Sequence, residues 1–167
     1  MTDLLHHVSE KLKGKFSEGL LKAEMHYDFP VFIVEKKIII DVLTYLKNDP
    51  DLDFNFLTTL CGLHMPENKG AELGVVYHLH NLKKNQRIRV KIFMPDGDTK
   101  VPTATVLWPA ADWMERQEYD FFGFEFTGHP DLRRILNMDE MNYFPMRKEY
   151  PLEDGSRDDK NDKMFGR

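Results

Sequence analysis

The stretch that most restricts the fold is QRIRVKIFM, residues 86–94, because its residues alternate strictly in character. Ile88, Val90, Ile92 and Met94 fall on one side of an extended chain, and cationic side chains fall between them on the other. Successive side chains of a β-strand point to opposite faces. The pattern therefore predicts a strand with one apolar face and one charged face.

Other segments show the periodicity of helices or strands. Helical spacing of apolar residues predicts helices in residues 2–16 and 36–48. The β-forming residues of segment 23–35, which Pro30 interrupts, predict two strand pieces or an edge strand. Two further strands are predicted before residue 86, so that three strands follow the second helix; their segments are residues 53–65 and 72–82. The order helix, two strands, helix, three strands describes a two-layer α+β domain.

After residue 108 the sequence shows the signals of a helix instead of strand alternation. Asp112 with Glu115 three positions later predicts a capping box, which opens a helix that ends at Gly123. One more helical turn is predicted from Pro130. The spacing of apolar residues beyond it gives no further element.

We therefore divide the chain into three parts. Residues 1–108 are the α+β core domain, residues 109–136 are a signature helix and docking segment, and residues 137–167 are an extended C-terminal arm. The end of the arm, residues 147–167, holds six basic and six acidic residues and few apolar ones. Such a composition buries too little surface to fold alone, so we expect the arm to be partly disordered without partners.

Composition excludes several classes of function. The formal net charge of −5 lacks the basic footprint of a general nucleic-acid binder. The single thiol, Cys61, cannot supply the four thiolates of an iron–sulfur cluster, and a buried, inert cysteine is the favoured interpretation. No glycine-rich phosphate loop, nucleophile elbow, signal peptide or membrane span is evident.

Two polar clusters have ordinary explanations. His78 and His80 share a strand face, but two imidazoles are too few for a metal site and a third ligand cannot be placed, so a solvated strand face is the favoured interpretation. A basic stripe lacks the stacking aromatic residues of RNA-binding sheets, so a solvated or partner-covered face is favoured. Its residues are Lys83, Lys84, Arg87, Arg89 and Lys91.

The predicted helix of residues 112–122 has charges within its apolar arc. At about 100° per residue, Gln117 and Glu118 fall within an apolar arc. The residues of this arc are Trp113, Met114, Phe121 and Phe122. Arg116 and Asp120 are four residues apart and can pair along the helix. Burying Glu118 costs several kcal/mol unless a cation or donor meets it. The cations considered are Arg133, Arg134, Arg147 and Lys148.

Three interpretations of this segment remain open. Carboxylate–guanidinium pairs can join the helix to the arm and leave other groups for a partner. The same pairs can serve only to tie the arm to its own domain. An acid/base enzyme is the least favoured, because it needs a substrate pocket around Glu115 and Glu118 that the sequence does not imply.

These residues resemble the signature of the thirty-kilodalton subunit of NADH-quinone oxidoreductase, respiratory complex I. The family pattern has a third acidic position where this chain has Gln117. Residues 75–92, 108–117 and 145–152 also resemble segments of the family. The positions that fit the signature are Glu115, Arg116, Asp120, Phe121, Phe122, His129, Arg133, Ile135 and Leu136.

The resemblance implies a non-catalytic structural subunit in the hydrophilic arm of a proton-translocating NADH:quinone oxidoreductase. It implies no catalytic, cofactor-binding or metal-binding residue in this chain; FMN, iron–sulfur clusters and quinone are expected in partner subunits. The expected partners are other complex I subunits, chiefly the 49 kDa-type subunit and the cluster-bearing subunits of the peripheral arm.

The resemblance also implies a place in the cell and a set of contact residues. The chain is expected on the cytoplasmic side of the inner membrane, attached indirectly through the complex and without nucleic acid. The alternative is the equivalent subunit of a related membrane-bound hydrogenase-type complex. The candidates for bracing or partner contact are Glu115, Arg116, Glu118, Asp120, His129, Arg133, Arg134, Arg147 and Lys148.

Overall fold

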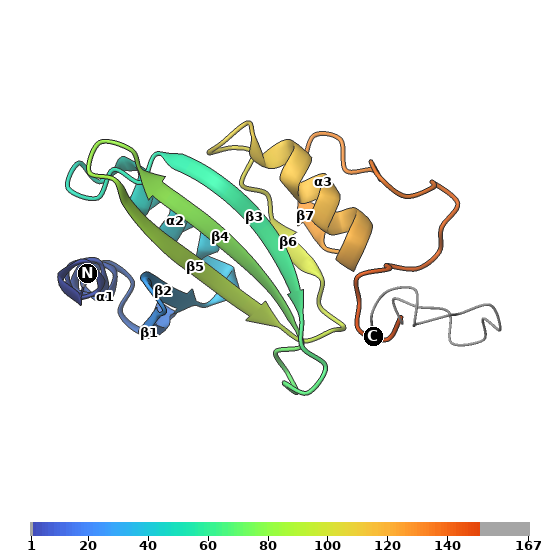
Figure 1. The fold of residues 1–167 in the computed structure, drawn as a ribbon, viewed down its shortest axis with the longest axis horizontal. Coiled ribbons are helices and arrows are strands. Elements are labelled where there is room, and N and C mark those ends of the chain that lie inside the picture. Colours follow the sequence, from blue (N-terminus) through green and yellow to red (C-terminus); the bar gives the residue numbers. More distant parts are fainter. Residues whose placement is uncertain (1, 151–167) are drawn as a thin grey trace, which may run out of the picture.

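The structure is a computed structural model that describes residues 2–150 of the 167. Its elements follow the predicted order, helix, two strands, helix, three strands, before two additional short strands that flank a third helix (Figure 1). The elements are α1 (Thr2–Phe16), β1 (Leu20–His26), β2 (Phe29–Val34), α2 (Ile39–Asn48), β3 (Phe56–His64), β4 (Leu73–Asn81), β5 (Gln86–Met94), β6 (Lys100–Pro102), α3 (Ala111–Phe122) and β7 (Glu125–Thr127).

The central sheet has five strands in the order β1-β2-β5-β4-β3. All neighbouring strands are antiparallel except β2 and β5, which run parallel. A parallel pair needs a crossover. Here the chain leaves β2, passes through α2, β3 and β4, and returns to the sheet as β5. The α+β fold class is therefore confirmed, with mixed strand directions.

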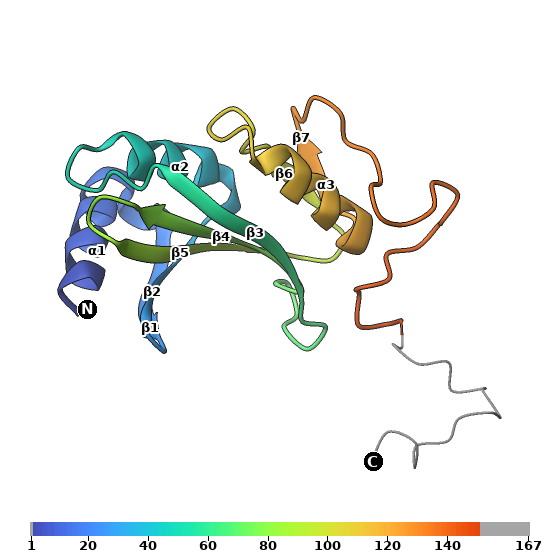
Figure 2. The ribbon, with the colours of Figure 1, turned by 45° about the horizontal axis from the view of Figure 1, so that its top comes forward.

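One face of the sheet carries the core. Phe32, Val90, Tyr77 and Leu60 are almost completely buried and face one another across four strands in register. Figure 2 shows α2 and α3 over the same face of the sheet. The predicted alternation of residues 86–94 is confirmed, because the cations of β5 are not buried, whereas four apolar residues between and beyond them are: Ile88, Val90, Ile92 and Met94. Among residues 2–150, no helix has both the length and the hydropathy needed to span a membrane.

The α3 helix lies across β3, and glycine permits the close approach. A Cβ atom on Gly62 of β3 would come within 2.7 Å of the Glu118 carboxylate and 2.7 Å of the Phe122 ring. The helix ends at Gly123, as predicted, in the left-handed conformation with φ 82°. The Phe144 ring of the arm then packs where a Gly123 side chain would be.

Two local predictions after residue 108 are wrong. The residue before α3 is Ala110, which forms no side-chain cap, and Glu115 faces the interior instead of closing a capping box with Asp112. Residues 129–136 form no helical turn after Pro130, because their backbone groups bind the side chain of Asp120. Residues 151–167, where most of the charged tail falls, lie outside the described residues.

Candidate functional site: the α3 helix and the C-terminal arm

The α3 helix buries four ionisable side chains within twelve residues. Glu115 and Asp120 are 0% exposed, Glu118 is 2% exposed and Arg116 is 7% exposed. A buried charge is costly unless it is paired or hydrogen-bonded. The partners of each side chain therefore show what the segment is built to hold.

Asp120 holds the start of the arm. One carboxylate oxygen, Oδ2, accepts hydrogen bonds from the backbone N–H groups of Ile135, Leu136 and Asn137, at 3.2, 2.8 and 2.9 Å. The other oxygen accepts from Arg134 Nη1 at 2.6 Å and Asn137 Nδ2 at 3.0 Å. Burial opposes ionisation of Asp120, but these hydrogen bonds outweigh it and hold the pKa of the carboxyl well below its usual range.

Arg134 extends this contact further along the arm. Its guanidinium also donates to the carbonyl oxygens of Asp120, Met141 and Tyr143, at 3.0, 2.8 and 3.0 Å. The Phe144 ring centroid lies 5.2 Å from the guanidinium carbon. Arg134 thus holds residues 141–144 close to the buried carboxylate of Asp120. Asp120 and Arg134 together form what we call the arm clamp.

The two glutamates join α3 to the core domain without any cation. Glu115 accepts hydrogen bonds from Thr103 Oγ1 and from the Ala104 N–H, both at 2.6 Å. Glu118 accepts from the Gly62 N–H at 2.7 Å and from Gln117 Nε2 at 3.3 Å. Burial raises the pKa of each of these carboxyls to about 7, although the hydrogen bonds partly oppose the rise.

Arg116 and His129 hold the loop between β7 and the arm. Arg116 donates from Nε to the Arg133 carbonyl at 3.3 Å, and its guanidinium carbon lies 4.9 Å from the Trp113 ring centroid. His129 donates from Nε2 to the Asp112 carbonyl at 3.2 Å and accepts the Asp131 N–H at Nδ1. This tautomer follows from the partners, because a carbonyl only accepts and an N–H only donates.

The far end of the described arm returns to the sheet. Arg147 donates from Nε to the Phe122 carbonyl at 2.8 Å and pairs with Asp96 at 2.8 Å. The backbone N–H of Lys148 donates to His64 Nδ1 at 2.9 Å. The arm, orange to red in Figure 1, therefore leaves α3 and comes back to it, fixed at both ends.

The structure corrects three expectations about these residues. Arg116 does not pair with Asp120, because Asp120 is taken by Arg134 and the arm backbone. Glu118 meets a backbone N–H, not a cation, because α3 lies directly on β3. Gln117 and Trp113 do not lie in a buried arc; Gln117 is exposed and Trp113 is 64% exposed.

Seven of the nine predicted residues make contacts that join α3, the arm and the core to one another. Within residues 2–150, the side chains of the other two, Arg133 and Lys148, make no such contact. Arg133 is 69% exposed and pairs only with its neighbour Asp131. The Lys148 side chain is exposed, and only its backbone takes part. Sequence reasoning missed Thr103, Gly62, Asn137 and His64, since neutral partners leave no charge pattern to find.

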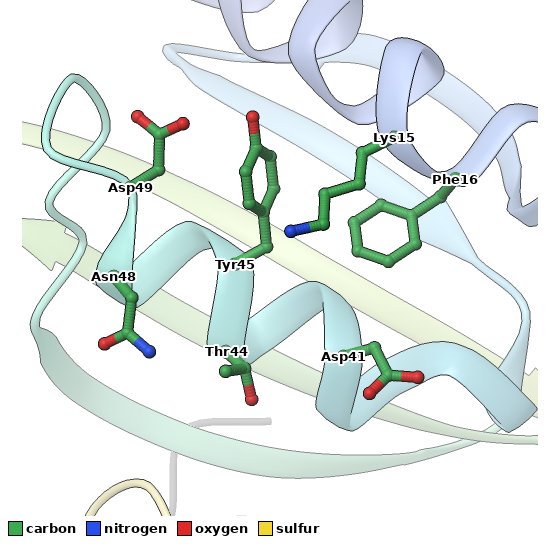
Figure 3. Close-up of a pocket in the computed structure, with 7 residues that line it drawn as sticks. All are labelled: Lys15, Phe16, Asp41, Thr44, Tyr45, Asn48 and Asp49. Carbon is green, nitrogen blue, oxygen red and sulfur yellow. The ribbon is translucent and has the colours of Figure 1, made fainter.

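The two buried glutamates of α3 are closed to a substrate. Glu115 and Glu118 are buried beneath α3 and cannot reach a ligand. A groove of about 460 Å³ lies between α1 and α2, lined by other residues (Figure 3). There Lys15 Nζ lies 4.3 Å from the Tyr45 ring centroid, and Asp49 pairs with Lys11. Among residues 2–150, no three His, Cys, Asp or Glu residues gather closely enough to hold a metal ion.

The histidines and cysteine of the sheet also have local roles. His80 is largely buried, not solvated, and its Nε2 lies 3.1 Å from Asn85 Oδ1. Cys61 is half-buried, and burial raises the pKa of its thiol. A raised thiol pKa reduces the thiolate that a nucleophile would need.

Comparison with known proteins gives a consistent assignment. A family described as "Respiratory-chain NADH dehydrogenase, 30 Kd subunit" matches residues 32–156. A relative from Streptomyces coelicolor, named as the C subunit of NADH-quinone oxidoreductase, is 40% identical over 152 residues, which is 87% of this chain and 61% of the relative. A relative of the same name from a Chelativorans species is 40% identical over 91% of this chain and 73% of its own length. The chain thus spans about three fifths of the Streptomyces relative.

Solved structures share the fold. A trypsin-resistant fragment of Nqo5 superimposes with a TM-score of 0.64 and 28% identity, covering 75% of this chain and 98% of the fragment. A chain of a membrane-bound sulfane sulfur reductase, an archaeal respiratory membrane complex, gives a TM-score of 0.71 at 24% identity, covering 88% of this chain and 85% of that one. The second likeness concerns the fold alone.

Proposed function

The chain belongs to the family of the 30 kDa subunit of respiratory-chain NADH dehydrogenase, and we propose that it works as a structural subunit of complex I. In this role it stands in the hydrophilic arm of a proton-translocating NADH:quinone oxidoreductase. It supports electron transfer from NADH to quinone without carrying out any redox step itself.

The observation that carries this proposal is the arm clamp. Asp120, a fully buried charge of the family signature, binds the chain's own backbone, and Arg134 beside it binds both Asp120 and backbone carbonyls of the arm. Groups used in this way hold a shape and are not available for acid–base chemistry. Two of the interpretations are therefore compatible. The buried pairs tie the arm to its own domain, and the arm held in this way offers its exposed side chains as a docking surface.

The clamp leaves large apolar side chains exposed on the arm and on α3. Exposed apolar clusters on a folded surface are typical of sites where another protein binds. We propose that these side chains, together with Arg133, contact the 49 kDa-type subunit and the cluster-bearing subunits of the peripheral arm. The exposed residues are Trp113, Leu136, Met138, Tyr143, Met146 and Tyr150.

The redox groups belong, in this proposal, to the partners. With only Cys61, the chain cannot supply the four thiolates of an iron–sulfur cluster. We assign FMN, the clusters and quinone to neighbouring subunits. Membrane attachment is then indirect, through the complex, on the cytoplasmic side of the inner membrane.

Purification of the tagged full chain from its native membrane tests this function. We expect NADH-binding, cluster-bearing and 49 kDa-type subunits to elute with it, identified by mass spectrometry. Hydrogenase-type subunits in their place would establish the alternative, a related membrane-bound complex. Elution of the chain alone from gently solubilised membranes would contradict both.

A further inference from the structure

The sheet has a second face that α2 and α3 do not cover. In Figure 2 this face is turned away from both helices. Alternation of side chains places Val31, Val76, His78, Arg89 and Lys91 on it, from three neighbouring strands. We call this surface the open sheet face.

Cations dominate the open sheet face. Arg87, Arg89 and Lys91 lie two residues apart on β5, so their Cα atoms follow one another at about 7 Å. None of the ion pairs formed by residues 2–150 includes any of the three. Glu24 of β1 lies on the same face, but it pairs with Lys22 at 2.6 Å. After the hydrogen bond from Lys22, the charge of Lys91 also helps to lower the pKa of the Glu24 carboxyl, but no carboxylate of residues 2–150 forms a direct ion pair with the row.

Two polar atoms on this face are buried without a hydrogen bond, Arg89 Nε and His78 Nδ1. The two residues face each other across β4 and β5. The Arg89 guanidinium is already held in place, with its carbon 4.3 Å from the Phe29 ring centroid. Burial, with the nearby Arg89 and Lys91, lowers the pKa of His78 and favours its neutral form. The site thus presents an arginine that lies between Val31 and His78, is fixed on the Phe29 ring and has one nitrogen without a hydrogen bond.

This composition fits a protein partner better than a phosphate backbone. Arginine and aromatic residues are enriched in the centres of protein interfaces, and here the Arg89 guanidinium lies over the Phe29 ring. Val31 and Val76 beside it are already buried within the chain. Nucleic acids and anionic lipid surfaces are drawn by net positive charge, but the chain carries a formal net charge of −5. Carboxylates spaced as on a helix turn or on alternate strand residues would match the row on β5.

We propose that the open sheet face binds an acidic segment of a neighbouring polypeptide, whose carboxylates pair with Arg87, Arg89 and Lys91. The inference rests on the proposed function, since it takes the chain to be part of an assembly. It adds a second docking surface, on the side of the sheet opposite to α2 and α3.

Site-specific cross-linking in native membranes tests this surface. A benzophenone amino acid replaces Phe93, which lies on the open sheet face two residues beyond Lys91, in the tagged full chain. After irradiation and purification, we expect one dominant cross-linked peptide that is rich in Asp and Glu. Its yield should fall at least fivefold in a Lys91→Glu background. Lys37→Glu, an exposed reversal on another part of the chain, should leave the yield unchanged.

The outcomes separate this proposal from the proposed function, because co-eluting subunits are identified in the same samples. Co-elution of the subunits with no cross-link, or with a cross-link to a basic peptide, RNA or lipid, overturns the docking surface alone. A yield unchanged by Lys91→Glu overturns the ion pairing and with it the proposal. Absence of co-eluting subunits overturns both.

Discussion

At the scale of single residues, the buried carboxyls of α3 have different partners and opposite shifts in pKa. Asp120 receives an arginine and three backbone N–H groups, and its pKa is lowered. Glu115 and Glu118 receive fewer, uncharged donors, and burial raises the pKa of both to about 7. The sequence indicates that Glu118 is buried, but it cannot indicate its partner, because a backbone N–H such as that of Gly62 has no sequence signal.

Replacement of Asp120 by Asn should loosen the arm. The variant loses the charge that Arg134 pairs with and leaves that buried guanidinium poorly compensated, so the free energy of unfolding should fall by roughly 2–4 kcal/mol. Urea unfolding measures the loss, and limited proteolysis should show earlier cleavage between residues 137 and 150. Asp131→Asn is the control, since Asp131 is half exposed, pairs with Arg133 at the surface and comes no closer than 4.0 Å to the buried Arg116. Equal losses in the two variants would contradict the arm clamp.

The two glutamates should give stability a distinctive pH dependence. Their folded pKa values, about 7, lie above the ordinary value of 4.5, so folding takes up protons between these limits. This contribution to stability is fully present below pH 4.5 and is lost as pH rises through 7. We expect Glu115→Gln and Glu118→Gln each to flatten the decline between pH 5 and pH 8, by about 1–3 kcal/mol. Parallel pH profiles for the variants and the natural chain, from urea unfolding, would show that these side chains are not the cause.

At the scale of elements, strong periodicity predicts the long segments well. The helix of residues 2–16 and the alternating strand of residues 86–94 appear with the predicted bounds. The pair β6 and β7 has no sequence signal, because three residues show too little alternation and the partners are some 25 positions apart in the chain. Residues 129–136 resemble the start of a helical turn in sequence, but Asp120 binds the N–H groups that such a turn would use.

The contact between α3 and β3 should not accept a side chain at position 62. In Gly62→Ala the new Cβ would meet the Glu118 carboxylate and two aromatic rings at 2.7–2.8 Å. Overpacking of this kind costs about 1–3 kcal/mol of unfolding free energy, measured by denaturant titration. Gly14→Ala in α1 is the control: nothing lies within 4 Å of its new Cβ, and stability should rise by about 0.5–1 kcal/mol. A neutral Gly62→Ala variant would mean that α3 does not lie against β3 as described.

At the scale of the whole molecule, the residues that brace the fold are separate from those that we propose to contact partners. Its buried charges hold α3 and the arm to the core, while the exposed apolar residues and Arg133 face outward. The family resemblance identifies this segment from its residues alone. Neither composition nor periodicity can do so, because docking surfaces are defined by partners that the sequence of one chain does not contain.

Reversal of charge at Arg133 should act on assembly and leave folding unchanged. Arg133 is largely exposed and pairs only with Asp131 at the surface, so Arg133→Glu should shift the free energy of unfolding by no more than about 0.5 kcal/mol. In native membranes, the amount of assembled complex on non-denaturing gels should fall severalfold. Lys37→Glu matches it in exposure and in its surface pair with a residue two positions earlier, and should assemble normally. Normal assembly of Arg133→Glu would remove that residue from the docking surface.

The central claim is that this chain enables a redox reaction by holding other subunits and has no redox activity of its own. The most direct measurement is the rate of NADH-dependent quinone reduction in membranes that lack the chain and in membranes to which its gene is restored. We expect the rate to collapse without the chain and to recover with it, while the purified chain alone has no activity. An unchanged rate in its absence, or quinone reduction by the isolated chain, would contradict the claim.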